Sequence, residues 1–100
     1  MFEFKKKQDG TKLTYELSGR LDTTTAPALD NELHVSLDGI TALDFDISGL
    51  EYVSSAGLRV FLAAQKIMNK QGEMAVRGVS EEVMEVFEVT GFTGILNIEK

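Results

Sequence analysis

The sequence predicts a single α/β domain spanning residues 1–100, in which helices pack against a mixed, mostly parallel β-sheet. The predicted order of elements is β-β-α-β-α-β-α-β. The chain has 100 residues, which is enough for one domain and too few for two. Apolar residues alternate with polar ones in some segments and recur at helical spacing in others. After an opening hairpin these segments alternate, and strand-helix-strand units join parallel strands by right-handed crossovers.

The first two strands are predicted to form an antiparallel hairpin. Phe2 and Phe4 alternate with charged residues, which is typical of a strand with one buried face. The dipeptide Asp9-Gly10 is a strong turn signal between strands. Residues 13–18 alternate again and predict the second strand.

A helix and a third strand are predicted to follow. The threonines at residues 23–25 offer N-caps, Pro27 is tolerated in a first helical turn, and Gly39 ends the helix. Leucines recur at every fourth position of this helix, at Leu29, Leu33 and Leu37. Residues 43–48 then show strand alternation, and a short connection follows over residues 49–53.

The second half of the chain predicts two helices and two short strands. Residues 54–72 form a helix that is apolar on much of its surface, so we expect it to be well buried. A strand is expected at residues 74–76. Residues 80–91 begin with a serine followed by acids, which suits a helix start, and end with a glycine. The last strand is expected at residues 95–98.

The composition excludes several classes of function. The net charge is −6, which argues against nucleic acid and anionic membrane surfaces as partners, because both require a basic face. The chain has no cysteine, so disulfides, zinc-thiolate sites and thiol catalysis are excluded. No cluster suggests a metal, and we expect no cofactor. The N-terminal residues do not read as a signal peptide, and the longest apolar run, residues 60–64, is far too short to span a membrane. We therefore expect a cytoplasmic protein.

Polar residues follow the strands at the carboxyl edge of the predicted sheet, where sites form in open parallel sheets. Asp22 follows the second strand. Asp46 and Ser48 end the third strand. Ser54 and Ser55 open the long helix that comes next. We therefore expect two carboxylates and a pair of serines to converge on one edge.

The serine pair allows three interpretations. A serine that caps the helix contributes ~1 kcal/mol, and either Ser54 or Ser55 fits this role. A catalytic serine needs a base, but the only histidine, His34, is expected to face solvent away from the strand ends, and the G-x-S-x-G elbow is missing. We therefore do not expect an enzyme. A phosphorylated serine would carry about −1.5 to −2 charges. A helix N-terminus tolerates this negative charge, whereas the carboxylates of Asp22 and Asp46 would repel it.

Four stretches of the sequence resemble a known family. They are residues 19–22 (GRLD), residues 46–58 (DISGLEYVSSAGL), residues 72–74 (GEM) and residues 86–92 (VFEVTGF). In order and spacing, over nearly the whole chain, they are similar to the STAS domain of anti-sigma factor antagonists.

The resemblance implies a partner-switching regulator. In such systems the unphosphorylated antagonist binds an anti-sigma factor that is also a serine kinase, and a serine phosphatase reverses the modification. Aligned on Gly57, the phosphorylated residue is Ser55. The resemblance also implies a set of partner-binding or phosphosite-supporting residues: Asp22, Thr23, Asp46, Ser54, Ala56 and Gly57.

Two positions depart from the best-known antagonists and leave an alternative open. Ser54 stands where those proteins have aspartate, and Ala56 stands where they have serine or threonine. The alternative is a STAS scaffold that is not phosphorylated and serves a transport or other signalling complex. A nucleotide site has no support, because the sequence contains neither G-x-G-x-x-G nor a P-loop. The sequence leaves open whether the chain forms a homodimer.

Overall fold

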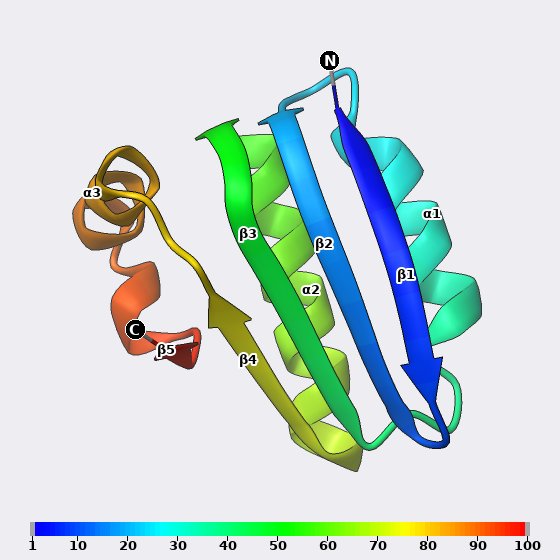
Figure 1. The fold of residues 1–100 in the computed structure, drawn as a ribbon. Helices are drawn as coiled ribbons and strands as arrows, with labels where there is room; N and C mark the ends of the chain where they lie inside the picture. The colour runs from blue at the N-terminus through cyan, green and yellow to red at the C-terminus, as the bar shows by residue number, and fades with distance from the viewer. Residues whose placement is uncertain (1, 100) are drawn as a thin grey trace.

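Within residues 2–99, which the computed structural model describes, five strands form one mixed sheet (Figure 1). The strands are β1 (Glu3–Asp9), β2 (Lys12–Leu21), β3 (Ala42–Val53), β4 (Glu73–Arg77) and β5 (Ile98–Glu99). Their order in the sheet is β1-β2-β3-β4-β5, the same as in the chain. β1 runs antiparallel to β2, and each later pair is parallel. The predicted mixed sheet is confirmed.

Helices cover one face of this sheet. They are α1 (Ala26–Ser36), α2 (Ser55–Gln71), α3 (Glu81–Thr90) and the short 3-10 helix η1 (Phe92–Gly94). Figure 1 shows α1 and α2 side by side behind the strands, with α3 at the left, toward the end of the sheet that holds β4 and β5. The predicted order of strands and helices is confirmed, with η1 as an addition. No helix within residues 2–99 is long and apolar enough to cross a membrane.

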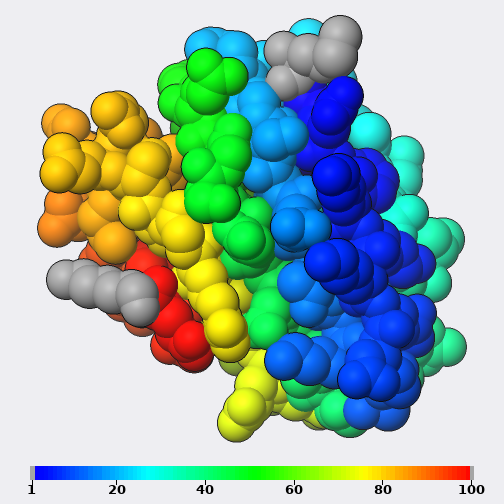
Figure 2. All heavy atoms as spheres, in the orientation of Figure 1, coloured from blue at the N-terminus to red at the C-terminus, as the bar shows by residue number. Residues whose placement is uncertain are grey.

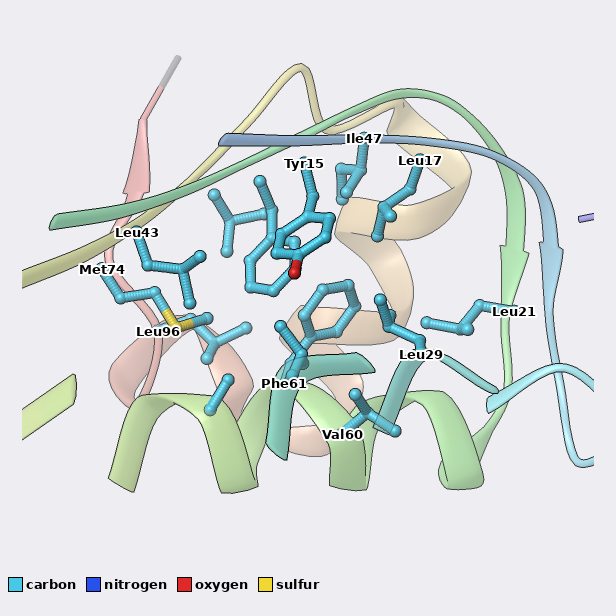
Figure 3. Close-up of a cluster of buried hydrophobic side chains, with 14 of the residues drawn as sticks. Tyr15, Leu17, Leu21, Leu29, Leu43, Ile47, Val60, Phe61, Met74 and Leu96 are labelled. Carbon is cyan, nitrogen blue, oxygen red and sulfur yellow. The ribbon is translucent and has the colours of Figure 1, made fainter. Parts of the chain in front are cut away.

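Four fully buried aromatic rings run through the core. Figure 3 shows two of them, Tyr15 and Phe61, among the buried side chains between the sheet and the helices. The ring centroids of Tyr15 and Phe45 are 5.8 Å apart, those of Phe45 and Phe61 are 5.2 Å apart, and those of Phe61 and Phe87 are 6.2 Å apart. Burial of one such side chain contributes roughly 1.5–3 kcal/mol to folding. The rings come from β2, β3, α2 and α3, so they fix both α2 and α3 against the central strands.

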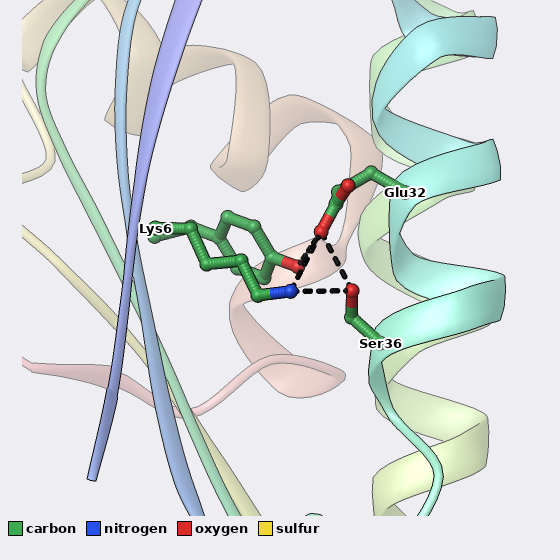
Figure 4. A network of polar contacts seen from close by, with 4 residues as sticks. Lys6, Glu32 and Ser36 are labelled. Carbon is green, nitrogen blue, oxygen red and sulfur yellow. Dashed lines mark hydrogen bonds and ion pairs between the residues drawn. The ribbon is translucent and has the colours of Figure 1, made fainter.

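A polar network joins β1 and β2 to α1 (Figure 4). The Tyr15 hydroxyl donates to Glu32 Oε2 at 2.7 Å, and Ser36 Oγ donates to the same oxygen at 2.6 Å. Lys6 Nζ lies 3.3 Å from that oxygen and donates to Ser36 Oγ at 2.9 Å. Burial raises the pKa of Tyr15, whereas the hydrogen bonds from Ser36 and Tyr15 lower the pKa of Glu32. The network therefore holds Tyr15 neutral and Glu32 ionised.

The opposite face of the sheet carries no helix among residues 2–99. Figure 2 shows this face, on which side chains of β1, β2 and β3 form adjoining bands. Ion pairs cross the strands there: Lys7 with Glu16 at 3.7 Å, and Asp44 with both Lys12 at 3.5 Å and Arg77 at 3.6 Å. Exposed pairs of this kind contribute little stability, about 0–1 kcal/mol each. The domain therefore has two layers, and the outer face of its sheet is polar.

The third strand is longer than the sequence indicates. The prediction of a strand over residues 43–48 and a connection over residues 49–53 is wrong, because β3 continues to Val53. Leu50 and Val53 are both buried but lie three positions apart, which breaks the alternation typical of a strand. Two register shifts in the pairing of β2 with β3 accommodate the broken pattern. The carboxyl end of β3, where α2 begins, therefore lies well past the carboxyl end of β4, which pairs with β3 only as far as Asp46.

Candidate functional site

The candidate site lies where β2 and β3 end beside each other and α2 begins. Leu21 pairs with Val53 at the last position of the two strands. The backbone N–H of Ser54 then donates to the carbonyl oxygen of Leu21 at 2.9 Å. Asp22 and Ser54 thus follow two adjacent strand ends, which confirms that the β2–α1 loop and the start of α2 share one edge of the sheet.

Ser54 is the residue that caps α2. Its backbone is extended, and its Oγ accepts a hydrogen bond from the Gly57 N–H at 3.4 Å. The carbonyl oxygen of Ser54 accepts the first helical hydrogen bond, from Leu58 N–H at 2.9 Å. Of the two serines that the sequence offered for capping, the structure assigns this role to Ser54.

Ser55 is the first residue of α2 and is exposed. Within the described part of the chain, its hydroxyl takes part in no hydrogen bond. Because the Ser54 side chain accepts the hydrogen bond from the first turn of α2, the Ser55 hydroxyl has no capping role. A group attached to it would extend into solvent rather than into the core.

Gly57 allows the first turn of α2 to pack closely on the end of β2. A Cβ atom at this position would lie 2.9 Å from Leu21 Cγ and 3.0 Å from the Leu21 carbonyl oxygen. Both contacts are closer than ordinary packing permits. Gly57 is buried, and the neighbouring Ala56 is half-buried. The glycine therefore sets how near Ser55 comes to the loop that follows β2.

Asp22 organises the loop between β2 and α1. Its Oδ1 accepts hydrogen bonds from the Thr24 hydroxyl at 2.7 Å, from the Thr24 N–H at 3.0 Å and from the Thr25 N–H at 3.2 Å. These bonds, that of the Thr24 hydroxyl foremost, lower the pKa of Asp22. Thr23 stands exposed at the tip of this loop. The carboxylate is thus ionised and held by its own loop, next to the strand end that precedes Ser54.

The threonines do not cap α1 in the expected way. Thr25 occupies the N-cap position, but its side chain makes no capping hydrogen bond. Its hydroxyl instead donates to the carbonyl oxygen of Arg20 at 2.8 Å and accepts from the Asp22 N–H at 2.9 Å. A threonine therefore stands at the predicted N-cap position, but its hydroxyl closes the loop around Asp22 and makes no capping hydrogen bond.

Asp46 does not lie with Asp22 and Ser55. It pairs with Glu16 on β2 and with Arg77 on β4, seven residues before Val53. Seven residues of strand span on the order of 20 Å. The expected convergence of Asp46 and Ser48 with the serine pair is therefore wrong, because β3 is longer than predicted. Asp46 Oδ1 accepts the Ser48 N–H at 3.0 Å, so it shapes its own strand locally.

An open groove of about 520 Å³ between α1 and α2 begins at this site. Its walls include small apolar side chains of both helices, and its long polar side chains are Asp30, His34 and Arg59. Asp30 Oδ1 lies 3.5 Å from His34 Nδ1. Thr23 and Ala56 also contribute to the lining. The sequence reasoning missed this groove and Arg59, although Arg59 stands four residues after Ser55, which is the spacing of neighbours on a helix face.

His34 is placed away from the serines. It lies in the last turn of α1, eight residues after the first residue of this helix, which corresponds to roughly 12 Å along the axis. Its side chain is 61 % exposed, and its Nδ1 lies 2.8 Å from the carbonyl oxygen of Asp30. The expectation of a solvent-facing histidine is confirmed, and its ring nitrogen contacts its own helix rather than a serine. No group of three potential metal ligands occurs among residues 2–99.

The fold and the sequence define a family. The model of the STAS domain family matches residues 3–100, so this chain belongs to the STAS domain family. The anti-sigma-B factor antagonist of Listeria monocytogenes is 32 % identical over 97 residues, which cover 94 % of this chain and 84 % of that protein.

Solved structures agree on the fold. The crystal structure of an anti-sigma factor antagonist from Mycobacterium paratuberculosis matches with a TM-score of 0.87 at 23 % identity, over 98 % of this chain and 85 % of that chain. The Bacillus cell fate determinant SpoIIAA in its phosphorylated form matches with a TM-score of 0.76 at 15 % identity, over 98 % and 92 % of the respective chains. The predicted family and fold are confirmed.

Proposed function

We propose that this protein is an anti-sigma factor antagonist that switches partners according to the phosphorylation of Ser55. In its unphosphorylated form it binds, in the cytoplasm, an anti-sigma factor that is also a serine kinase. Phosphorylation releases this partner, and a serine phosphatase restores binding. The antagonist from Listeria monocytogenes that resembles the chain over nearly its whole length supports the assignment.

The observation that carries this proposal is the division of roles between the two serines. Ser54 caps α2, and Ser55 presents an exposed hydroxyl at the first helical position. A phosphate on Ser55 leaves the capping bond from Gly57 to Ser54 in place. Its charge of about −1.5 to −2 lies at the positive end of the helix dipole, so the helix accommodates it. The modification therefore changes the surface and leaves the fold intact.

The change of surface is large for a partner that docks at this edge. The ionised carboxylate of Asp22 follows β2 directly beside the start of α2, and a phosphate on Ser55 adds further negative charge to the same surface. A partner that pairs with Asp22 in the unphosphorylated protein meets a bulky dianion after modification. A partner surface that fits closely over Ser55 would have to bury this added charge without a cation to pair with it, and this cost suppresses binding.

Phosphorylation with an anti-sigma factor kinase and ATP, followed by intact mass analysis, tests the proposal. We expect one added phosphate on the wild type and none on Ser55→Ala. Ser54→Ala is the matched control, because it removes the neighbouring hydroxyl and should still acquire one phosphate. Two results would contradict the proposal: a wild type that stays unmodified with the kinase from its own genome, or a Ser55→Ala variant that gains as much phosphate as the wild type.

The residues on either side of Ser55 favour a second candidate function. Ser54 and Ala56 are not the flanks of the best-known antagonists, and a STAS scaffold in a transport or other signalling complex needs no phosphorylated serine. A binding measurement on the samples from the mass experiment separates the two functions. A chain that binds its partner with equal affinity before and after treatment with kinase and ATP supports the scaffold.

A further inference from the structure

We propose that Arg59 pairs with the phosphate of Ser55, and that this ion pair withdraws the guanidinium from the groove between α1 and α2. The inference rests on the phosphorylation of Ser55 in the proposed function and adds how the modified state is held. Phosphorylation then alters two features of the docking surface together: it adds an anion at Ser55 and removes a free cation from the groove.

The spacing of the two residues brings them together. Ser55 is the first residue of α2, and Arg59 follows four positions later, so both lie on one face of the helix. Cβ atoms at this spacing are roughly 5–6 Å apart, within reach of an arginine side chain. Both residues are exposed. The anion lies N-terminal to the cation, which is the more favourable orientation of such a pair on a helix.

Arg59 is available for this contact, unlike the other two arginines. The guanidinium of Arg20 stacks over the ring of Tyr52, with 4.5 Å from its Cζ to the ring centroid. Arg77 forms ion pairs with Asp44 at 3.6 Å and with Glu99 at 3.3 Å. Within residues 2–99, Arg59 takes part in no ion pair and no side-chain hydrogen bond.

Two carboxylates on this side of the molecule have contacts of their own. Asp30, which lines the same groove as Arg59, has its Oδ1 3.5 Å from His34 Nδ1. Asp22 accepts hydrogen bonds from Thr24 and Thr25 in its own loop. Within residues 2–99, a phosphate on Ser55 therefore meets a guanidinium that no carboxylate already holds in an ion pair. Arginine suits this role, because its planar fork forms bidentate hydrogen bonds with phosphate oxygens.

The pairing should appear in the ionisation of the phosphate itself. The second pKa of phosphoserine is about 6, and a neighbouring cation favours the dianion and lowers this pKa. The carboxylates of Asp22 and Asp30 act in the opposite direction. Both are unchanged in the variants below, so a comparison of variants isolates the effect of Arg59.

Phosphorus NMR titration of the full chain with phosphoserine installed at position 55 during translation tests the inference. Relative to the wild type, we expect Arg59→Gln to raise the second pKa by about 0.3 units or more, the shift that corresponds to one helix ion pair. Lys66→Gln is the matched control: it removes the same charge from α2, but at a position roughly 16 Å from Ser55 along the helix axis, and should leave the pKa unchanged. Arg59→Lys should restore part of the shift.

Equal pKa values in the wild type and Arg59→Gln, or equal shifts in Arg59→Gln and Lys66→Gln, would overturn the inference. Glutamine is a good helix former and Arg59 is exposed, so loss of folding does not interfere. Because phosphoserine is installed without a kinase, the outcome is independent of whether a kinase modifies Ser55. Failure of the further inference can therefore be distinguished from failure of the proposed function.

Discussion

At the scale of single residues, the two adjacent serines of α2 have different surroundings. Ser54 is half-buried and accepts the Gly57 N–H, whereas Ser55 is exposed and starts the helical backbone. The sequence alone predicts that one of them caps the helix, because serine is a preferred N-cap. It does not decide which, because the decision depends on the backbone angles at the end of β3.

The first prediction concerns the stability contributed by each serine. Ser54→Ala should lower the free energy of unfolding by about 1 kcal/mol, because a first-turn N–H loses its acceptor. Ser55→Ala should change it by less than about 0.5 kcal/mol, as is usual for exposed positions without a capping role. Urea unfolding followed by circular dichroism measures both. Equal losses in the two variants would contradict the assignment of the cap to Ser54.

At the scale of elements, strand lengths were harder to predict than element types. The alternation of Leu43, Phe45 and Ile47 predicts a strand correctly, but the spacing of Leu50 and Val53 hides its continuation. Bulged strands bury residues at irregular intervals, so their sequence is indistinguishable from that of a loop. This error also misplaced Asp46, because a residue predicted to end the strand lies near its middle.

The network around Glu32 leads to a prediction about acid stability. Hydrogen bonds from Ser36 and Tyr15, together with Lys6, lower the pKa of Glu32 from its ordinary value of 4.5. A carboxyl group with a lowered pKa stabilises the fold fully above the ordinary value, and this contribution is lost as the pH falls through the pKa of the folded state. The protein should therefore lose stability as the pH falls below about 4.5.

Glu32→Gln isolates this contribution. The variant cannot lose a proton at this position, so the difference in urea midpoint between the wild type and the variant should shrink as the pH falls below about 4.5. Asp22, whose pKa is also lowered, is present in both proteins, and its contribution cancels in the difference. A difference that stays constant between neutral and acidic pH would contradict a role for the ionised carboxylate.

At the scale of the whole molecule, the order of elements and the family were predictable from the sequence. The hairpin signal, the alternation of strand and helix patterns and the segment of residues 46–58 each indicated the same architecture. The groove between α1 and α2 was not predictable, because it depends on how closely two helices pack. Its long polar side chains come from separate elements: Asp30 and His34 lie on α1, and Arg59 lies on α2.

The order of strands in the sheet predicts which backbone amides exchange most slowly with solvent. β3 lies between β2 and β4 and supplies core residues such as Phe45, whereas β5 is two residues long at the edge of the sheet. In hydrogen exchange monitored by NMR, the amides of Leu43, Phe45 and Ile47 should be among the slowest, near the limit of global unfolding. Amides of Ile98 and Glu99 should exchange far faster. Comparable protection of β5 and β3 would contradict this ranking.

The identical order of the strands in the sheet and in the chain has a consequence for synthesis. As the polypeptide leaves the ribosome at about 5–20 residues per second, each strand can pair with the one made just before it. No strand has to wait for a later one to insert at its side. New strands are added at one edge of the sheet only. The other edge is β1, whose Lys5, Lys6 and Lys7 discourage pairing with other chains. The nascent sheet therefore exposes one growing edge at a time to mispairing.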